Sequence, residues 1–239
     1  MDALFGKGAH GWSLFWTGAK KKIDETDGAV EMKRRFLFYG GIFGPVAYLL
    51  VDIIGGIITP GYSYVVNAVS ELIQTGSEHT LLLSPLMSIS AIMGVLFGVG
   101  IVSNFRYRQS KLLFIGGTLI IISGIMTSLT ASIFPQDPIG ADVTFRGTMH
   151  LVLVGISAVL TIPGMLTIGI GLYREKKWKL FRLYSIIAVV IMTIFGGLSP
   201  LLIMSDIELA GLFERIVVYG YWAWVFVLAT LFIKEQPSE

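Results

Sequence analysis

The chain has 239 residues, of which 54% are hydrophobic and only 14% are charged, and its mean hydropathy is +0.75. One core of a water-soluble domain cannot bury that much apolar surface, so a soluble fold is excluded. Cysteine is absent, which excludes disulfides, thiolate metal sites and cysteine nucleophiles.

Six apolar runs follow one another along the chain, and each is long enough to cross a hydrocarbon layer of roughly 30 Å as a helix. They cover residues 36–58, 81–102, 112–134, 147–172, 183–204 and 216–233. We therefore predict an all-α integral membrane protein with one six-span domain at 36–233 and a short tail at 234–239. No small-residue cleavage site precedes the first run, so we expect a retained span rather than a signal peptide.

The segment before the first span, residues 1–35, combines aromatic residues with a basic cluster. Trp12 and Trp16 are followed by Lys20, Lys21 and Lys22, a pattern that suits the headgroup region of an anionic leaflet. The segment is either an interfacial anchor or an arm that docks a partner.

Basic residues predict the orientation, because cytoplasmic loops hold Lys and Arg in excess. Of the 18 Lys and Arg residues, all but Arg146 and Arg215 fall in the termini or in the second and fourth loops. We therefore expect both termini on the cytoplasmic side of the cell membrane.

Glycine is frequent inside the spans, with 28 glycines in the chain. Small residues let helices approach closely in lipid, so we expect a compact bundle. The same GxxxG spacings also suit a dimer face, which leaves the oligomeric state open.

The first outer loop is long and runs from the turn Thr59-Pro60-Gly61 to Gly76. Its middle is predicted to form a short amphipathic helix that lies flat on the outer surface, because apolar and polar residues recur at helical spacing. The apolar face comprises Val65, Val66, Val69, Leu72 and Ile73, and the polar stripe comprises Asn67, Ser70, Glu71 and Gln74. This stripe is either a solvated surface or one wall of a site.

Further ionisable residues gather at the outer ends of the spans. Asp52 lies roughly 9 Å below the outer end of the first span, where a carboxylate is costly without a polar partner. If that partner is neutral, Asp52→Asn should be mild and Asp52→Leu worse. The other members are Asp137, Arg146, His150, Glu214 and Arg215. Each alone has a simple packing or capping explanation, and together they predict an outward-facing polar pocket.

Short motifs at these positions carry a family resemblance. They are Gly61-Tyr62-Ser63, Asn67 to Leu72, Phe134 to Asp137, Gly147 to His150 and Gly211 to Ile216. In their order and spacing, over about residues 36 to 233, they resemble the prokaryotic family catalogued as domain of unknown function 998. The resemblance implies a six-span prokaryotic membrane protein and no known reaction. It points to Glu71, Asp137, His150, Glu214 and Arg215.

Two classes of function remain open. In the first, the pocket binds or handles a lipid headgroup or small polar molecule through Asp52, Asn67, Ser70, Arg146 and Arg215. The two arginines suit phosphate or carboxylate. The same residues could instead only hold helices together, in a structural or partner-binding subunit.

In the second class the pocket is catalytic. Glu71, Asp137, His150 and Glu214 would hold one divalent metal that activates water beside lipid ester or amide groups. A metal-free hydrolase would use Ser70 as nucleophile and His150 as base, although no Gly-x-Ser-x-Gly elbow is present. Convergence of the four metal candidates within about 4 to 6 Å would favour a shared site.

Other cofactors and partners are not expected. Heme would require two histidines within the membrane and only one is present there, and no nucleotide site is expected. Nucleic acid is not expected, because the basic residues follow the topology and form no reading module. The expected partners are membrane lipids and a ligand on the outer face.

Overall fold

A computed structural model describes residues 35–104, 110–172, 176–205 and 208–235. The chain divides into two compact units, Met1–Phe36 and Leu37–Glu239. The predicted N-terminal arm, residues 1–35, lies outside the described residues except at its last position.

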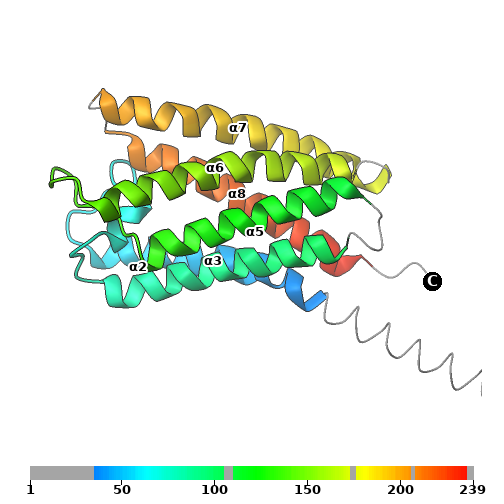
Figure 1. Ribbon diagram of the computed structural model, residues 1–239, viewed down its shortest axis with the longest axis horizontal. Helices are drawn as coiled ribbons and strands as arrows, with labels where there is room; N and C mark the ends of the chain where they lie inside the picture. The colour runs from blue at the N-terminus through cyan, green and yellow to red at the C-terminus, as the bar shows by residue number, and fades with distance from the viewer. Residues whose placement is uncertain (1–34, 105–109, 173–175, 206–207, 236–239) are drawn as a thin grey trace, which may run out of the picture. The chain divides into compact units, whose positions relative to one another are not determined.

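Six long helices run side by side in the second unit (Figure 1). They are α2 (Gly40–Ile58), α3 (Thr80–Ser103), α5 (Lys111–Ser132), α6 (Phe145–Gly171), α7 (Lys179–Met204) and α8 (Ala210–Lys234). Within the described residues, these are the segments long and apolar enough to cross a membrane, and no strand is present. The predicted all-α, six-span architecture is confirmed, while the side of the membrane that each end faces stays a prediction.

The predicted helix ends are close to the observed ones except at α8. This helix begins at Ala210, whereas the apolar run was expected to begin at residue 216. Glu214 and Arg215 interrupt the hydropathy pattern without interrupting the helix, because their polar atoms have hydrogen-bond partners in the first loop and in α2.

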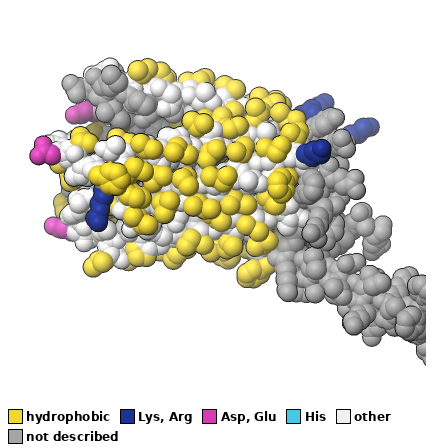
Figure 2. Space-filling model, in the orientation of Figure 1, with side chains coloured by type: hydrophobic (Ala, Val, Ile, Leu, Met, Phe, Trp, Pro, Cys, Tyr) yellow, Lys and Arg dark blue, Asp and Glu magenta, His cyan; other side chains and the backbone are white. Residues whose placement is uncertain are grey.

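The main helix contacts follow a ring, in which each helix packs on the next in chain order and α8 packs back on α2. One end of this bundle carries the loop between α2 and α3, residues 59–79, which we call the first loop. We call that end the loop end and the opposite one the basic end. Figure 2 shows an apolar belt between an end with Asp and Glu side chains and an end where most of the visible Lys and Arg side chains lie.

Glycines allow the helices to approach closely, as the composition predicted. A Cβ added at Gly116 of α5 would lie 2.6 Å from Ile168 Cγ1 of α6. A Cβ added at Gly41 of α2 would lie 2.6 Å from the Ala229 Cβ of α8. Both contacts are shorter than carbon atoms tolerate, so these positions fit glycine alone without a shift of the neighbouring helix.

The first loop contains the predicted short helix, but it is a 3-10 helix of five residues, η1 (Val69–Ile73). Gly61 and Gly76 adopt φ angles of 75° and 82° on either side of it, which glycine adopts without strain. The predicted apolar face is buried at Val69, Leu72 and Ile73. Val65 and Val66 lie outside the helix, because their carbonyls bind the start of α8 instead.

Candidate functional site

A buried ion pair joins the first and last spans at the loop end. Arg215 of α8 donates through Nε to Asp52 Oδ2 of α2 at 3.0 Å and through Nη2 to Asp52 Oδ1 at 2.7 Å. Asp52 is 0% exposed and Arg215 is 6% exposed. The polar partner expected for Asp52 is therefore present, but it is a cation. A neutral Asn in its place would leave the arginine charge unbalanced, so the expectation of a mild Asp52→Asn effect does not hold.

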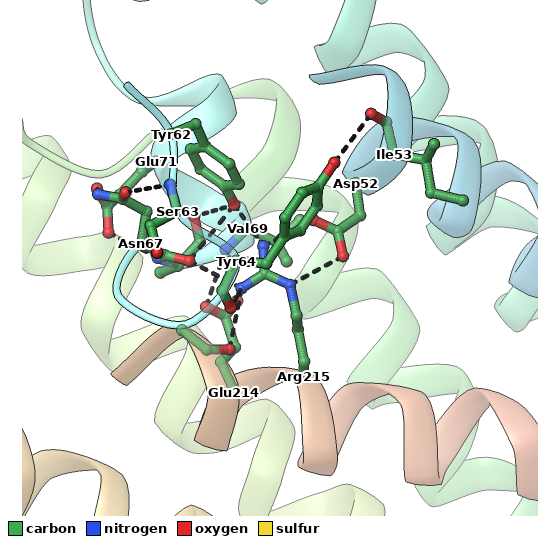
Figure 3. Close-up of polar contacts among 12 residues, drawn as sticks. Asp52, Ile53, Tyr62, Ser63, Tyr64, Asn67, Val69, Glu71, Glu214 and Arg215 are labelled. Atoms are coloured by element: carbon green, nitrogen blue, oxygen red, sulfur yellow. Dashed lines mark hydrogen bonds and ion pairs between the residues drawn. The ribbon is translucent and has the colours of Figure 1, made fainter. Parts of the chain in front are cut away.

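The remaining donors of Arg215 fix the first loop (Figure 3). Nη1 donates to the carbonyl oxygens of Tyr64 at 2.6 Å and Asn67 at 2.8 Å, and to that of Gly211 at 3.0 Å. Nη2 also donates to the Tyr62 hydroxyl at 2.6 Å. Each of the three guanidinium nitrogens thus has an acceptor within the protein, and in this conformation Arg215 offers no free donor to an outside anion.

Three tyrosines complete the surroundings of this pair. The Arg215 Cζ atom lies 5.5 Å from the ring centre of Tyr62 and 5.1 Å from that of Tyr64, which are cation–π distances. Tyr219, one turn after Arg215, donates its hydroxyl to Asp52 Oδ2. Burial raises the pKa of Tyr62 above its ordinary value, so this hydroxyl stays protonated and donates to the Ala68 carbonyl at 3.0 Å.

The first turn of α8 is capped by the first loop. The backbone N–H groups of Gly211 and Leu212 donate to the carbonyls of Val66 at 3.1 Å and Val65 at 2.9 Å. A helix start leaves such donors without intrahelical partners, and the loop supplies the acceptors. Gly211 leaves room for this contact, because an added Cβ would collide with the carbonyl of Asn67.

Glu71 stabilises the loop from within. Its Oε1 accepts the backbone N–H of Ala68 at 2.7 Å, and its Oε2 accepts from Asn67 Nδ2 at 2.7 Å. The first bond is one half of a capping box, in which a residue three positions into a helix reaches back to its cap. Both carboxylate oxygens of Glu71 are therefore committed to holding the loop in shape.

Glu214 differs from its neighbours. Its Oε2 accepts the backbone N–H of Val69 at 3.0 Å. Among the described residues, Oε1 has no hydrogen-bond partner, and the side chain is partly exposed. Three carboxyl groups, those of Asp52, Glu71 and Glu214, thus lie near one guanidinium group, and one carboxyl oxygen, Glu214 Oε1, is uncommitted.

Asp137 and His150 form a separate group between α5 and α6. Asp137 accepts from the backbone N–H and the hydroxyl of Thr144, both at 2.7 Å, and these bonds hold the pKa of Asp137 below its usual range. Thr144 in turn caps α6 by accepting the N–H of Gly147. His150 is 5% exposed, and its Nδ1 lies 2.9 Å from the Phe134 carbonyl, to which it must donate.

The structure brings together five of the predicted site residues, namely Asp52, Asn67, Glu71, Glu214 and Arg215. The predicted metal site of Glu71, Asp137, His150 and Glu214 is not formed. In the described part of the chain no three His, Asp or Glu side chains lie close enough to share a metal ion, because these four belong to two different groups.

Two predicted site residues, Ser70 and Arg146, belong to neither group. Ser70 and His150 are not hydrogen-bonded to each other within the described ranges, so the expected nucleophile and base do not meet. Arg146 is exposed and makes no ion pair with a described residue.

The predicted site residues include none of the three tyrosines and do not include Thr144. Tyr219 had a signal, because it lies four residues after Arg215 on one helix face. Tyr62 and Tyr64 had none, because their contacts depend on how the loop folds back over α8.

Hydroxyl groups form a polar seam between α5 and α6. Ser123 Oγ lies 2.7 Å from Ser157 Oγ and 2.6 Å from Thr161 Oγ1, and Thr127 Oγ1 lies 2.9 Å from Ser157 Oγ. Such bonds join helices in lipid, so the seam helps to hold α5 and α6 together.

Comparison with known proteins identifies one family. Neither the curated proteins nor the solved structures contain a significant match. The model of one family matches residues 42–231, which is most of the chain and includes every residue of the group around Arg215. This six-span membrane protein belongs to the family described as protein of unknown function DUF998.

Proposed function

We propose that this protein binds a small polar group, either a lipid headgroup or a free small molecule, at the loop end of its bundle. The charge pattern predicts that this end faces outward from the cell membrane. Glu214 is the residue proposed to contact the ligand, and the first loop is the rigid frame that positions it.

One observation carries this proposal, the uncommitted Oε1 atom of Glu214. The carboxylate is oriented by the Val69 N–H at 3.0 Å and is partly exposed. Its charged neighbours are occupied, since Arg215 pairs with Asp52 and Glu71 binds Ala68 and Asn67. An oriented acceptor with a free lone pair is a usual feature of small-molecule sites.

The chemistry of Glu214 limits the ligand to hydrogen-bond donors. An ionised carboxylate only accepts, so its partner is an ammonium group or a hydroxyl. The excess of carboxylates over the single guanidinium favours a cation, because like charges repel an anionic partner. We therefore expect an amine-bearing ligand to bind better than a phosphate or a carboxylate without an amine.

The Asp52–Arg215 pair supports the frame role. A bidentate pair that also binds three backbone carbonyls fixes the loop without help from a ligand. A site that is already ordered loses less entropy on binding. The same pair is also what a purely structural subunit would need, which makes that role the second candidate.

The test is thermal unfolding of the purified protein with glycerophosphoethanolamine, and with glycerol phosphate as the probe that lacks the amine. The amine probe should raise the unfolding temperature of the parent and of Glu78→Gln, which changes an exposed glutamate of the same loop. Glu214→Gln should lose this shift while the empty variant keeps its stability, because the glutamine oxygen still accepts from Val69.

Two results would contradict the proposal. Glu214→Gln could respond to the amine probe as the parent does, which would remove Glu214 from the site. Alternatively, Glu214→Gln could unfold at a clearly lower temperature with no probe effect in any variant. That result would favour the structural role, in which Glu214 only ties the loop to α8.

A further inference from the structure

A line of residues on α8 faces the interior of the bundle and changes its burial halfway along. Val225, Leu228 and Phe232, toward the basic end, are 0%, 0% and 4% exposed. Glu214, Val218 and Tyr221 continue the same line at three- and four-residue spacing, but all three are partly exposed. The opposite face of α8 carries exposed residues such as Ala223 and Val227, so it is the face that meets lipid.

A line of residues on α6 changes its burial in the same way. Thr161, Met165 and Ile168 are 8%, 0% and 0% exposed. At the same spacing toward the loop end, Leu151 is 69% exposed, Val154 is 46% exposed and Ala158 is also exposed. On this face of α6, the side chains are thus buried in the half toward the basic end (the basic half) and exposed in the half toward the loop end (the loop half).

The α7 helix accounts for this change. In its basic half Phe181, Ser185, Ala188 and Met192 are buried, and a Cβ added at Gly169 of α6 would lie 2.7 Å from the Ser185 Cβ. From Thr193 to Ser199 no described side chain is buried. In this half α7 keeps its contact with α8, where the rings of Phe195 and Phe213 lie 5.0 Å apart.

Contact between α6 and α7 is therefore missing in the loop half. A Cβ added at Gly155 of α6 or at Gly197 of α7 would have no neighbour within 4 Å. The exposure of Leu151, Val154 and Ala158 on α6 and the partial exposure of Val218 and Tyr221 on α8 imply an open space between α6, α7 and α8 in this half, which we call the crevice. Toward the basic end the same lines become buried at Met165 and Val225, which sets the depth of the crevice.

Glu214 lies on the same line of α8, at the loop end of this crevice. From Glu214 to Val225 the helix rises by roughly 16 Å, about half of the hydrocarbon thickness. The walls below Glu214 are apolar apart from the Tyr221 hydroxyl. A single amphiphile, with its polar group at Glu214 and a chain below it, matches this distribution of polarity.

We propose that an amine-bearing phospholipid of the outer leaflet enters the crevice sideways between α6 and α7, with its ammonium group at Glu214 and an acyl chain between α6 and α8. This inference rests on the proposed function and names the source of its ligand. Two features select this occupant. The crevice opens at membrane depth, where a space between helices is accessible to lipid, and the excess of carboxylates attracts a cationic group.

The experiment uses the delipidated protein and two probes with the same head, dioleoylphosphatidylethanolamine and chain-free glycerophosphoethanolamine. Bound lipid is counted by native mass spectrometry and titrated by thermal stability. Ala158→Phe fills the crevice from α6, and Val159→Phe is the matched control, because Val159 is 71% exposed on the lipid side. The parent and Val159→Phe should retain the phospholipid, and Ala158→Phe should bind it at least about tenfold more weakly. Should Ala158→Phe fail to fold, Val154→Phe tests the same wall.

The outcomes separate this inference from the proposed function. If Ala158→Phe binds the phospholipid as Val159→Phe does, or if the chain-free probe binds as tightly as the phospholipid, the crevice proposal is wrong. Loss of chain-free binding in Glu214→Gln would still support the headgroup site in either case. If instead Ala158→Phe displaces the phospholipid while Glu214→Gln has no effect on either probe, a chain occupies the crevice and Glu214 does not hold the head. An amine-free phosphatidylglycerol that binds equally well would also contradict the proposed ligand.

Discussion

Removing one member of the Asp52–Arg215 pair should destabilise the protein far more than removing any exposed charge. Asp52→Asn keeps an oxygen near the guanidinium but leaves a buried positive charge without its counterion, at a cost of about 3–5 kcal/mol. Arg215→Met leaves the Asp52 charge unbalanced. It also removes the donor from the carbonyls of Tyr64, Asn67 and Gly211, each worth about 1 kcal/mol or more. We therefore expect Arg215→Met to be the less stable of the two.

The double variant distinguishes a charge pair from independent contacts. Asp52→Asn with Arg215→Met has no buried charge left, so its loss should be smaller than the sum of the single losses by about 1–3 kcal/mol. Tyr219→Phe removes only one hydroxyl donor to Asp52 and should cost about 1 kcal/mol. Arg146→Met is the control for loss of a loop-end arginine and should change stability by less than about 0.5 kcal/mol.

The assay is reversible unfolding in mixed micelles with increasing dodecyl sulfate, followed by the fluorescence of the buried Trp222 and Trp224. Strictly additive losses in the double variant would refute the ion-pair reasoning. If Arg146→Met lost as much unfolding free energy as Arg215→Met, the claim that the buried arginine stabilises the protein more than an exposed one would be refuted.

Three further predictions test the loop, the Asp137 group and the orientation. Gly211→Ala should lower stability by about 1–3 kcal/mol through overpacking, whereas Gly197→Ala, which faces open space, should be neutral in the same unfolding assay; equal effects would contradict the loop contact. Because hydrogen bonds lower the pKa of folded Asp137, its contribution is complete above about pH 4 and is lost as pH falls through the folded pKa. The stability difference between the parent and Asp137→Asn should therefore vanish in acid, and a difference that grows there would contradict the assignment. An impermeant thiol reagent on intact cells should label a cysteine at Thr75 and spare one at Lys177, and the reverse pattern would invert the predicted topology.

Much of the fold could be predicted, because in lipid a span must be both helical and apolar over a fixed length. Prediction failed where polar residues are internally satisfied. The start of α8 at Ala210 was not predicted, because two charged residues, Glu214 and Arg215, normally mark the end of an apolar span. Here they lie inside the helix, because the first loop and α2 supply hydrogen-bond partners for them. The η1 helix is shorter than its amphipathic pattern, because Val65 and Val66 serve as acceptors for another helix.

Several residues of the candidate site could be predicted from the sequence, but the contacts between them could not. Asp52 and Arg215 are 163 residues apart, and they meet only because α8 closes the ring against α2. Asp137 and His150 also lie near the ends of spans, but hydrogen bonds with the loop before α6 hold each of them locally. Sequence places both groups near one end of the spans and gives no information on which helices are neighbours.

Hydrogen exchange of the first loop tests most directly whether it is a fixed frame for Glu214. The amides of Asn67, Ala68, Val69 and Glu71 are hydrogen-bonded, and Arg215 ties the loop backbone to α8. In the parent protein, peptides that cover residues 65–72 should exchange slowly, and in Arg215→Met they should exchange far faster while peptides from the middle of α3 stay protected. Fast exchange of this segment in the parent, or the same slow exchange in Arg215→Met, would contradict the account.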